Sequence, residues 1–187
     1  MTYEVFNTSF LETFSNLLGM REANATFWQM LFFSKGWSRI QFEMHRNELI
    51  PKEELMRYSA IEQRLLKGEP LQYIIGKTEF YGQVHSVNPS VLIPRPETEE
   101  LVDWIVLEKK NEECSYLDVG TGSGCIINSL ALTTKGTYLG IDISEAALKV
   151  ARKNAEELNS AAIFKTDDIL NSQLGSEKFD VIVSNPP

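Results

Sequence analysis

The sequence predicts an α/β fold, a parallel sheet wrapped by helices, preceded by a small helical domain and a β-hairpin linker. Three observations predict it. Apolar residues recur every three to four positions as far as Gly68. The period then shifts towards two, and beyond Cys114 strand-like and helical segments alternate through short connections. We therefore divide the chain into a helical domain over residues 1–70, a β-hairpin linker over 71–93 and an α/β domain over 94–187.

Composition limits the classes of function. The chain has 187 residues, 43% of them apolar, which is enough for one medium domain or two small ones with a buried core. Its formal net charge is −8 at pH 7, and residues 91–187 hold 16 acidic against 9 basic side chains. This balance argues against a surface that binds nucleic acid, because such binding depends on Lys and Arg displacing counterions.

Neither a targeting segment nor a metal site is indicated. The N-terminal segment lacks the basic start and apolar core of a secretory signal, and no stretch approaches the roughly 18 apolar residues of a membrane span. We therefore expect a cytoplasmic protein. Cys114 and Cys125 lack CxxC spacing, and the chain has His45 and His85 as its histidines. We expect two buried thiols rather than a zinc site or a disulfide.

The helical domain is predicted from apolar stripes. Residues 4–18 and 51–68 each carry one, and in the second Pro51 suits the first helical position and Gly68 ends the run. The segment "ATFWQMLFFSKGW" between them is rich in aromatic residues. An aromatic run at helical spacing is typical of the core of a small helical domain, and we favour that interpretation over an exposed recognition patch.

Residues 71–93 are predicted to be extended. The segments "LQYIIG", "EFYGQVHSV" and "VLI" are punctuated by Gly76, Gly82 and Pro89, which indicates a hairpin or a short three-stranded element. The following "IPRPETEELVDWIVLEKK" begins a helix, with Pro96 at its first position and glutamates near its positive end.

Beyond Cys114 the predicted elements alternate as a parallel sheet requires. The strands are "SYLDV", "TYLGID", "AIFKT" and "FDVIVS", and the helices are "CIINSLALTT", "SEAALKVARKNAEEL" and the short "ILNSQL". Ligands of such sheets bind at the carboxyl ends of the strands.

A glycine-rich turn follows the first of these strands. In "DVGTGSGC", Gly120, Gly122 and Gly124 let the backbone turn tightly and approach a ligand, and free N–H groups at the helix start can receive a carboxylate or phosphate. Asp142 ends the next strand, 22 residues after Gly120, where its carboxylate can accept hydrogen bonds from ribose hydroxyls. We interpret the pair as a site for a nucleoside-containing cofactor rather than as a turn that only packs helix on sheet.

Two further segments end at the same predicted edge of the sheet. After the third strand, Asp167 or Asp168 is a candidate partner for an adenine amino group, and each is equally a candidate helix N-cap. After the fourth, "SNPP" offers the Asn185 carboxamide oxygen and carbonyls whose direction Pro186 and Pro187 fix. Such acceptors can hold a planar NH2 group and stabilise the charge that its nitrogen gains as a methyl group arrives. In isolation the tetrapeptide is also typical of a turn that closes a strand.

Four segments together resemble the HemK-type protein-(glutamine-N(5)) methyltransferases, which act on peptide chain release factors. They are "GEPLQYIIGKTEFYG", "VLIPRPETEELV", "LDVGTGSGC" and "VSNPP", and they match in order and spacing, from about residue 20 to the end. The resemblance implies the Rossmann-like fold of class I S-adenosylmethionine-dependent methyltransferases, here with strands 1 to 4 in the order 3-2-1-4. It also implies a helical domain that helps to recognise the protein substrate.

The resemblance also implies roles for particular residues. S-adenosyl-L-methionine would be the cofactor, and the substrate would be a class I release factor, methylated on the glutamine side chain of its Gly-Gly-Gln loop. The implied cofactor-binding residues are Gly120, Thr121, Gly122, Ser123, Gly124, Asp142 for the ribose, Asp168 and Ile169 near the adenine, and Asn185. The implied catalytic residues, which hold the glutamine amide, are Asn185, Pro186 and Pro187, and Arg95 to Thr98 would border the cleft.

Two alternatives and one departure from the family pattern stay open. An Asn-Pro-Pro pocket also suits an enzyme that methylates an amino group of adenine or guanine in nucleic acid, and the cofactor fold can serve in a non-catalytic binding module. The family motif continues with an aromatic residue after the second proline, whereas this sequence ends at Pro187. We therefore expect a truncated chain of weak or no activity, whose exposed fourth strand favours self-association.

Overall fold

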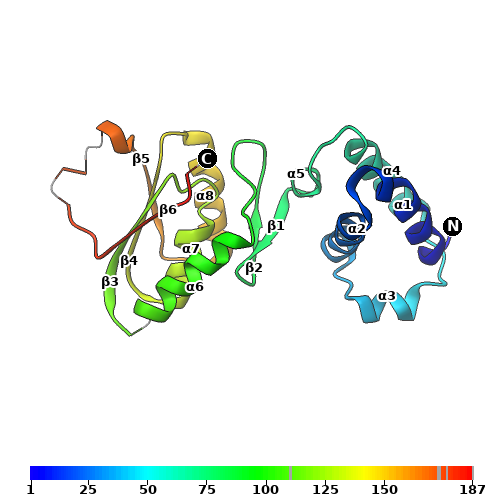
Figure 1. Ribbon diagram of the computed structural model, residues 1–187, viewed down its shortest axis with the longest axis horizontal. Coiled ribbons are helices and arrows are strands. Elements are labelled where there is room, and N and C mark those ends of the chain that lie inside the picture. Colours follow the sequence, from blue (N-terminus) through cyan, green and yellow to red (C-terminus); the bar gives the residue numbers. More distant parts are fainter. Residues whose placement is uncertain (110, 172–173, 176, 187) are drawn as a thin grey trace. The chain divides into compact units, whose positions relative to one another are not determined.

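In the computed structural model the chain divides into two compact units, Met1–Ile75 and Gly76–Pro187, each with a hydrophobic core of its own (Figure 1). The residues that the structure describes are 1–109, 111–171, 174–175 and 177–186. Among them, no helix has the length and apolar content needed to cross a bilayer.

The first unit is helical. Its helices are α1 (Tyr3–Leu18), α2 (Met20–Lys35), α3 (Arg39–His45), α4 (Lys52–Leu65) and α5 (Leu71–Ile75). The aromatic run on α2 faces the core as expected: Phe27 is fully buried, and its ring centroid lies 5.5 Å from that of Phe10 on α1. Phe32, on the other face of α2, is 42% exposed. Burial of large aromatic surface is therefore the main force that closes this unit.

A polar cluster ties three helices of the first unit together. The Glu54 carboxylate of α4 accepts hydrogen bonds from the hydroxyls of Tyr3 (2.9 Å) and Tyr58 (2.5 Å) and from Lys35 Nζ (2.9 Å). Because each donor comes from a defined turn of α1, α2 or α4, the cluster fixes the register between these helices as well as satisfying partly buried polar groups.

The expectation that "LQYIIG" is extended is wrong, since residues 71–75 form α5. The carbonyl of Pro70 accepts hydrogen bonds from the N–H groups of Tyr73 and Ile74, both at 3.1 Å, which begins a helical turn. Leu71 is buried, and Ile74 packs against the same core. Leu71 and Ile74 are three residues apart and contact the same core, as a helix allows. These contacts therefore outweigh the local β-propensity of the segment.

The hairpin itself is shorter than predicted. β1 (Lys77–Phe80) pairs antiparallel with β2 (Gln83–Ser86), and Phe80 lies opposite Gln83. The two residues of the turn, Tyr81 and Gly82, both have positive φ angles (51° and 69°), as a two-residue hairpin with a type I′ turn requires. The "VLI" segment does not add a third strand, and it lies in an irregular stretch before the next helix.

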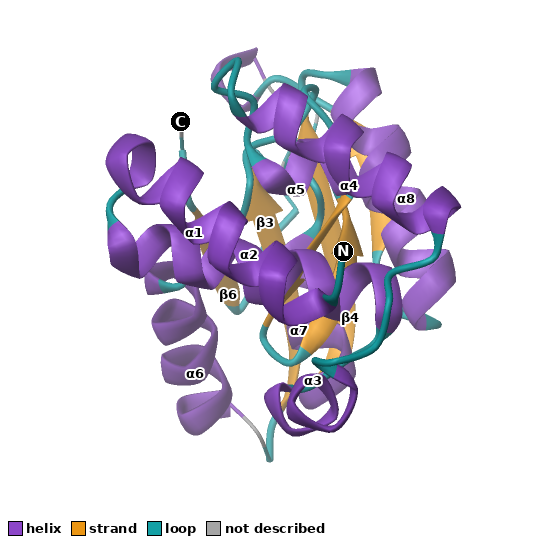
Figure 2. Ribbon diagram, turned by 90° about the vertical axis from the view of Figure 1, so that its right-hand side faces the viewer, coloured by secondary structure: helices purple, strands orange, loops and turns teal. Residues whose placement is uncertain are grey.

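The rest of the second unit is a parallel α/β arrangement, seen in Figure 2 as orange strands among helices. In chain order its elements are α6 (Glu97–Lys109), β3 (Glu113–Val119), α7 (Cys125–Thr133), β4 (Lys135–Asp142), α8 (Glu145–Leu158), β5 (Ile163–Thr166), a 3-10 turn η1 (Ile169–Asn171) and β6 (Val181–Ser184). The strand order β5-β4-β3-β6 confirms the predicted order 3-2-1-4. The predicted short helix "ILNSQL" is described only as η1, and residues 172–173 lie outside the described part. Cys114 and Cys125 are buried free thiols, as expected.

His85 on β2 is a buried histidine with no hydrogen bond to either ring nitrogen among the described residues. Its ring packs edge-on against Phe80, with centroids 6.0 Å apart. Burial lowers the pKa of His85 to about 4. The folded state therefore needs the neutral imidazole, whereas the unfolded chain takes up a proton near its ordinary pKa of about 6.5.

We expect His85→Leu to weaken the acid sensitivity of the fold. A lowered histidine pKa gives stability that is fully present above pH 6.5 and is lost as the pH falls towards 4. The free energy of unfolding in urea should therefore fall less for the variant than for the parent between pH 7 and pH 5. Parallel pH profiles for the two proteins would show that His85 is not held neutral.

Candidate functional site

The register of the parallel strands brings their carboxyl ends together. Val119 at the end of β3 lies opposite Ile141 on β4 and Ser184 on β6. At the end of β4, Asp142 lies opposite Thr166 on β5. The loops that follow these four strands consequently leave the sheet at one edge, where binding sites of parallel sheets are found.

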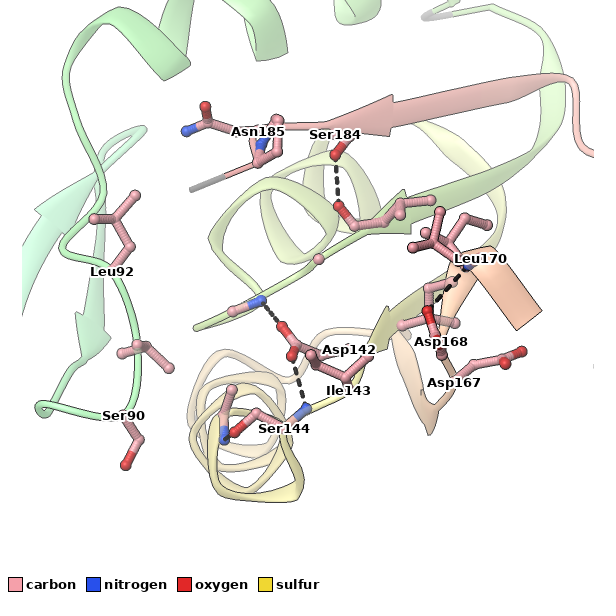
Figure 3. A pocket seen from close by; sticks show the side chains of 18 residues that line it. Ser90, Leu92, Asp142, Ile143, Ser144, Asp167, Asp168, Leu170, Ser184 and Asn185 are labelled. Carbon is pink, nitrogen blue, oxygen red and sulfur yellow. Dashed lines mark hydrogen bonds between the residues drawn. The ribbon is translucent and has the colours of Figure 1, made fainter. Parts of the chain in front are cut away.

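A cavity of about 480 Å³ opens at this edge (Figure 3). The loops after β3, β4, β5 and β6 line it, together with residues 90–92 of the segment between the hairpin and α6. In Figure 3, Ser90 and Leu92 lie on one side, Asp168 and Leu170 on the other, and Asp142 between them. Such a size suits a nucleoside-sized ligand.

Asp142 is held rigidly at the cavity wall. Its Oδ2 accepts a hydrogen bond from the N–H of Gly122 (2.9 Å), and its Oδ1 accepts one from the N–H of Ser144 (2.9 Å), as Figure 3 shows. The Ser144 hydroxyl in turn caps α8 by accepting from the N–H of Ala147. Each carboxylate oxygen keeps a second lone pair, so Asp142 can still accept hydrogen bonds from ligand hydroxyls.

The glycine turn supplies shape rather than hydrogen-bond donors. The N–H groups of Gly120 and Thr121 both donate to the carbonyl of Ile141 at 2.9 Å, that of Gly122 donates to Asp142, and that of Gly124 donates to the carbonyl of Thr121. None of these four N–H groups is therefore free to receive an anion, and the expectation of free N–H groups at the start of the following helix stays a prediction. Gly120 and Gly122 line the cavity with φ angles of 71° and 55°, which only glycine adopts without strain.

The predicted cofactor-binding residues divide into two groups. Those at the cavity are Gly120, Gly122, Asp142, Asp168, Ile169 and Asn185. Thr121, Ser123 and Gly124 are not among the lining residues: Thr121 Oγ1 donates to Asp118 Oδ2 (2.6 Å), and the Ser123 carbonyl accepts from Asn154. A Cβ on Gly124 would lie 3.1 Å from Phe164, so this glycine permits close packing of α7 on the sheet.

Asn154 on α8 is a residue that supports the loops around the cavity and that the sequence reasoning missed. Its side chain is fully buried. The Oδ1 atom accepts from the N–H of Ser86 (2.7 Å), and Nδ2 donates to the carbonyls of Ser86 (3.0 Å) and Ser123 (2.9 Å). It therefore joins the end of the hairpin to the glycine turn. The available signal was a polar residue within the buried stripe of α8, beside Ala151 and Ala155.

Replacing Asn154 by Leu should destabilise the second unit by about 3 kcal/mol, because three buried backbone groups would lose their partners. Asn154→Asp keeps the acceptor for the Ser86 N–H but sets a carboxylate oxygen against the two carbonyls, so it should also destabilise the unit. Urea unfolding checks both, with the exposed Glu156→Ala on the same helix as a control. A loss below about 0.5 kcal/mol for Asn154→Leu would mean that solvent replaces these hydrogen bonds.

Asp118 lies beneath the glycine turn and is almost completely buried. Its Oδ2 accepts from Thr121, but Oδ1 has no partner among the described residues. Burial raises the pKa of Asp118 to about 7, the Thr121 hydroxyl and the nearby Ile127 N–H oppose the rise, and the negative charge of Asp142 adds to it. The folded protein therefore holds a proton on this carboxyl over a range in which the unfolded chain has released it.

We expect Asp118→Asn to remove this proton dependence. A raised carboxyl pKa gives stability that is fully present below the unfolded value of about 3.8 and is lost as the pH rises through about 7. The free energy of unfolding of the variant should rise relative to that of the parent from pH 5 to pH 7. Above pH 7 the difference between the two should stop changing. Urea unfolding at several pH values measures it; a difference that does not change with pH would contradict a raised pKa.

The segment after β6 lies at the junction of two cavities. Asn185 and Pro186 line the larger cavity, and Asn185 also lines a second one of about 290 Å³, whose other walls are Arg95, Glu97, Thr98 and Leu101. The glycine turn and the Asn-Pro segment thus open onto a common space, as we expected. Pro187 lies outside the described residues.

Asp168 acts as a cap within the protein. Its Oδ1 accepts from the N–H of Leu170 (3.0 Å), and its Oδ2 accepts from Asn171 Nδ2 (2.9 Å), so it begins the η1 turn. Asp167 donates its N–H to the carbonyl of Asp142. Both aspartates line the cavity, and a contact of either with adenine stays a prediction.

Comparison with known proteins gives the class. Residues 110–186 match the family model described as a methyltransferase domain, and residues 11–76 match the one described as the PrmC N-terminal domain. Among solved structures, the chain is similar to the Pyrococcus abyssi tRNA (uracil-54, C5)-methyltransferase in complex with S-adenosyl-L-homocysteine, with a TM-score of 0.50 and 23% identity, over 59% of this chain and 28% of that one. The second unit therefore has the Rossmann-like fold of class I methyltransferases.

Curated relatives then define the family. The chain is 35% identical to the release factor glutamine methyltransferase of Flavobacterium psychrophilum over 100% of its own length and 67% of that protein. It is 40% identical to the protein of that name from Neisseria gonorrhoeae, over 94% of this chain and 65% of that protein. It is 49% identical to the one from Bacteroides thetaiotaomicron, over 66% of this chain and 45% of that protein. This chain belongs to the release factor glutamine methyltransferase family, and it spans about half to two thirds of the length of these relatives.

Proposed function

We propose that the chain binds S-adenosyl-L-methionine at the carboxyl edge of its parallel sheet and presents it to a glutamine side chain of a peptide chain release factor. The observation that carries the proposal is the position of Asn185, which borders both the larger cavity and the smaller one. The names of the family's curated members support the choice of substrate.

The larger cavity suits this cofactor better than a dinucleotide. Four N–H groups of the glycine turn are used within the protein, so the turn offers few donors to a pyrophosphate. Asp142, in contrast, offers carboxylate acceptors to ribose hydroxyls. Leu92, Ile143 and Leu170 supply apolar surface for a purine ring. When bound, the cofactor supplies an electrophilic methyl group.

The acceptor amide would be held by oxygen atoms of the chain. Its NH2 group can donate to Asn185 Oδ1, and prolines remove competing N–H donors from the same stretch of backbone. A carboxamide nitrogen is a weak nucleophile that becomes positively charged as it gains a methyl group. Fixed acceptors at that nitrogen stabilise the charge and then help its proton to leave.

We infer two accompanying properties from the same features. The helical unit Met1–Ile75 contributes to recognition of the release factor, in keeping with its match to the PrmC N-terminal domain. Self-association through β6 is supported by its position at the end of the described strand order and by Ile182, which is 65% exposed. The cytoplasmic location expected from the sequence stays a prediction.

Asp142→Ala should lower the affinity for S-adenosyl-L-homocysteine at least tenfold, because charge-assisted hydrogen bonds to the ribose contribute about 1.5–3 kcal/mol each. Isothermal titration measures this, with the exposed Glu156→Ala as a matched control. If Asp142→Ala and the parent bound S-adenosyl-L-homocysteine with equal affinity, Asp142 would not bind the ribose.

Transfer of a tritiated methyl group tests the substrate. A release factor with an intact Gly-Gly-Gln loop should be labelled, its Gln→Ala variant should not be, and neither should RNA or DNA. Labelling of nucleic acid alone would favour an enzyme acting on base amino groups. Cofactor binding without any transfer would favour a binding module or the weak activity that the sequence predicts.

A further inference from the structure

We propose that Thr98 is a positioning residue that orients the Asn185 carboxamide, so that its oxygen faces the acceptor amide. This inference rests on the proposed function, because it gives Asn185 Oδ1 the task of accepting a hydrogen bond from the substrate. The residue comes from the "PRPETE" segment, which the reasoning from cofactor and acceptor chemistry left without a defined role.

The contact joins two segments that are 87 residues apart in the chain. Asn185 Nδ2 donates a hydrogen bond to Thr98 Oγ1 at 3.1 Å. Thr98 is 8% exposed and lies in the first turn of α6, where its N–H bonds to the carbonyl of Arg95 at 3.0 Å. The hydroxyl therefore projects from a fixed piece of backbone. A nearly buried partner holds a side chain more firmly than a solvent-exposed one would.

The chemistry explains why the orientation matters. A carboxamide has an oxygen end and an NH2 end of almost equal shape, and either can occupy the same space. The reacting NH2 group of the acceptor amide brings N–H donors, so this group can be bound only by the oxygen end of Asn185. With Nδ2 engaged by Thr98, Oδ1 is left without a hydrogen bond among the described residues. A turned carboxamide would place donor against donor and would leave the developing charge without an acceptor.

The smaller cavity places this contact beside the space for the acceptor. Thr98 and Asn185 both line it, with Arg95, Glu97 and Leu101 around them. Because Asn185 also reaches the larger cavity, a fixed carboxamide at this junction determines how the two bound groups face one another. Thr98 thereby connects the start of α6 to the geometry of transfer.

The test compares Thr98→Val, which removes the hydroxyl at nearly constant volume, with Thr98→Ser, which keeps it. Thr137→Val, at an exposed position on β4, is the matched control. The direct readout is the side-chain NH2 signal of Asn185 in 15N NMR of the whole chain, assigned by its loss in Asn185→Asp. We expect a hydrogen-bonded, slowly exchanging signal in the parent, in Thr98→Ser and in Thr137→Val, and a shifted, rapidly exchanging one in Thr98→Val.

Two further measurements separate this inference from the proposed function. The affinity for S-adenosyl-L-homocysteine should be the same in Thr98→Val as in the parent, whereas kcat for methylation of the release factor should fall at least tenfold with little change in KM, and Thr98→Ser should restore most of the rate. An unchanged NH2 signal in Thr98→Val, or equal kcat values for the Val and Ser variants, would overturn the role of Thr98. If the parent neither binds the homocysteine ligand nor transfers a methyl group, the proposed function fails, and the NH2 signal still decides whether Thr98 orients Asn185.

Discussion

The parallel pairing of β3 with both of its neighbours is the constraint on which the site depends. Val119, Ile141 and Ser184 are in register, so the glycine turn, Asp142 and Asn185 all leave the sheet at the same level. Because side chains alternate along a strand, a shift of one residue in either pairing would turn the end of that strand to the opposite face. The register of the strands therefore determines where the site lies, and the loops supply the residues that line it.

Hydrogen bonds from a few polar side chains to the backbone hold those loops. Asp142 fixes the N–H groups of two turns, and Asn154 joins the hairpin end at Ser86 to Ser123. Asp142 takes the N–H of Gly122, and backbone carbonyls take those of Gly120, Thr121 and Gly124, so ligand recognition at the glycine turn passes to acceptors and to shape. That division suits a cofactor that carries hydroxyls and positive charge, and it agrees with an acceptor site built from Asn185.

Much of this arrangement could be predicted from the sequence, because it follows from local patterns. The parallel sheet followed from the alternation of strands and helices, and its strand order followed from the family resemblance. The shared cavity followed from glycines and Asp142 at strand ends. What could not be predicted depends on contacts between distant residues. Leu71 becomes helical because the core of the first unit accepts it, and Thr121 turns inward to Asp118. The partnership of Thr98 with Asn185 likewise exists only in the folded chain.

The central claim is that one edge of the sheet binds the cofactor with its transferable group towards Asn185. A crystal structure of the chain with S-adenosyl-L-homocysteine tests it most directly. The account predicts ribose hydroxyls within hydrogen-bonding distance of the Asp142 carboxylate and the sulfur atom on the side of Asn185. A ligand bound away from Asp142, or one whose sulfur points away from the Asn-Pro segment, would contradict the account.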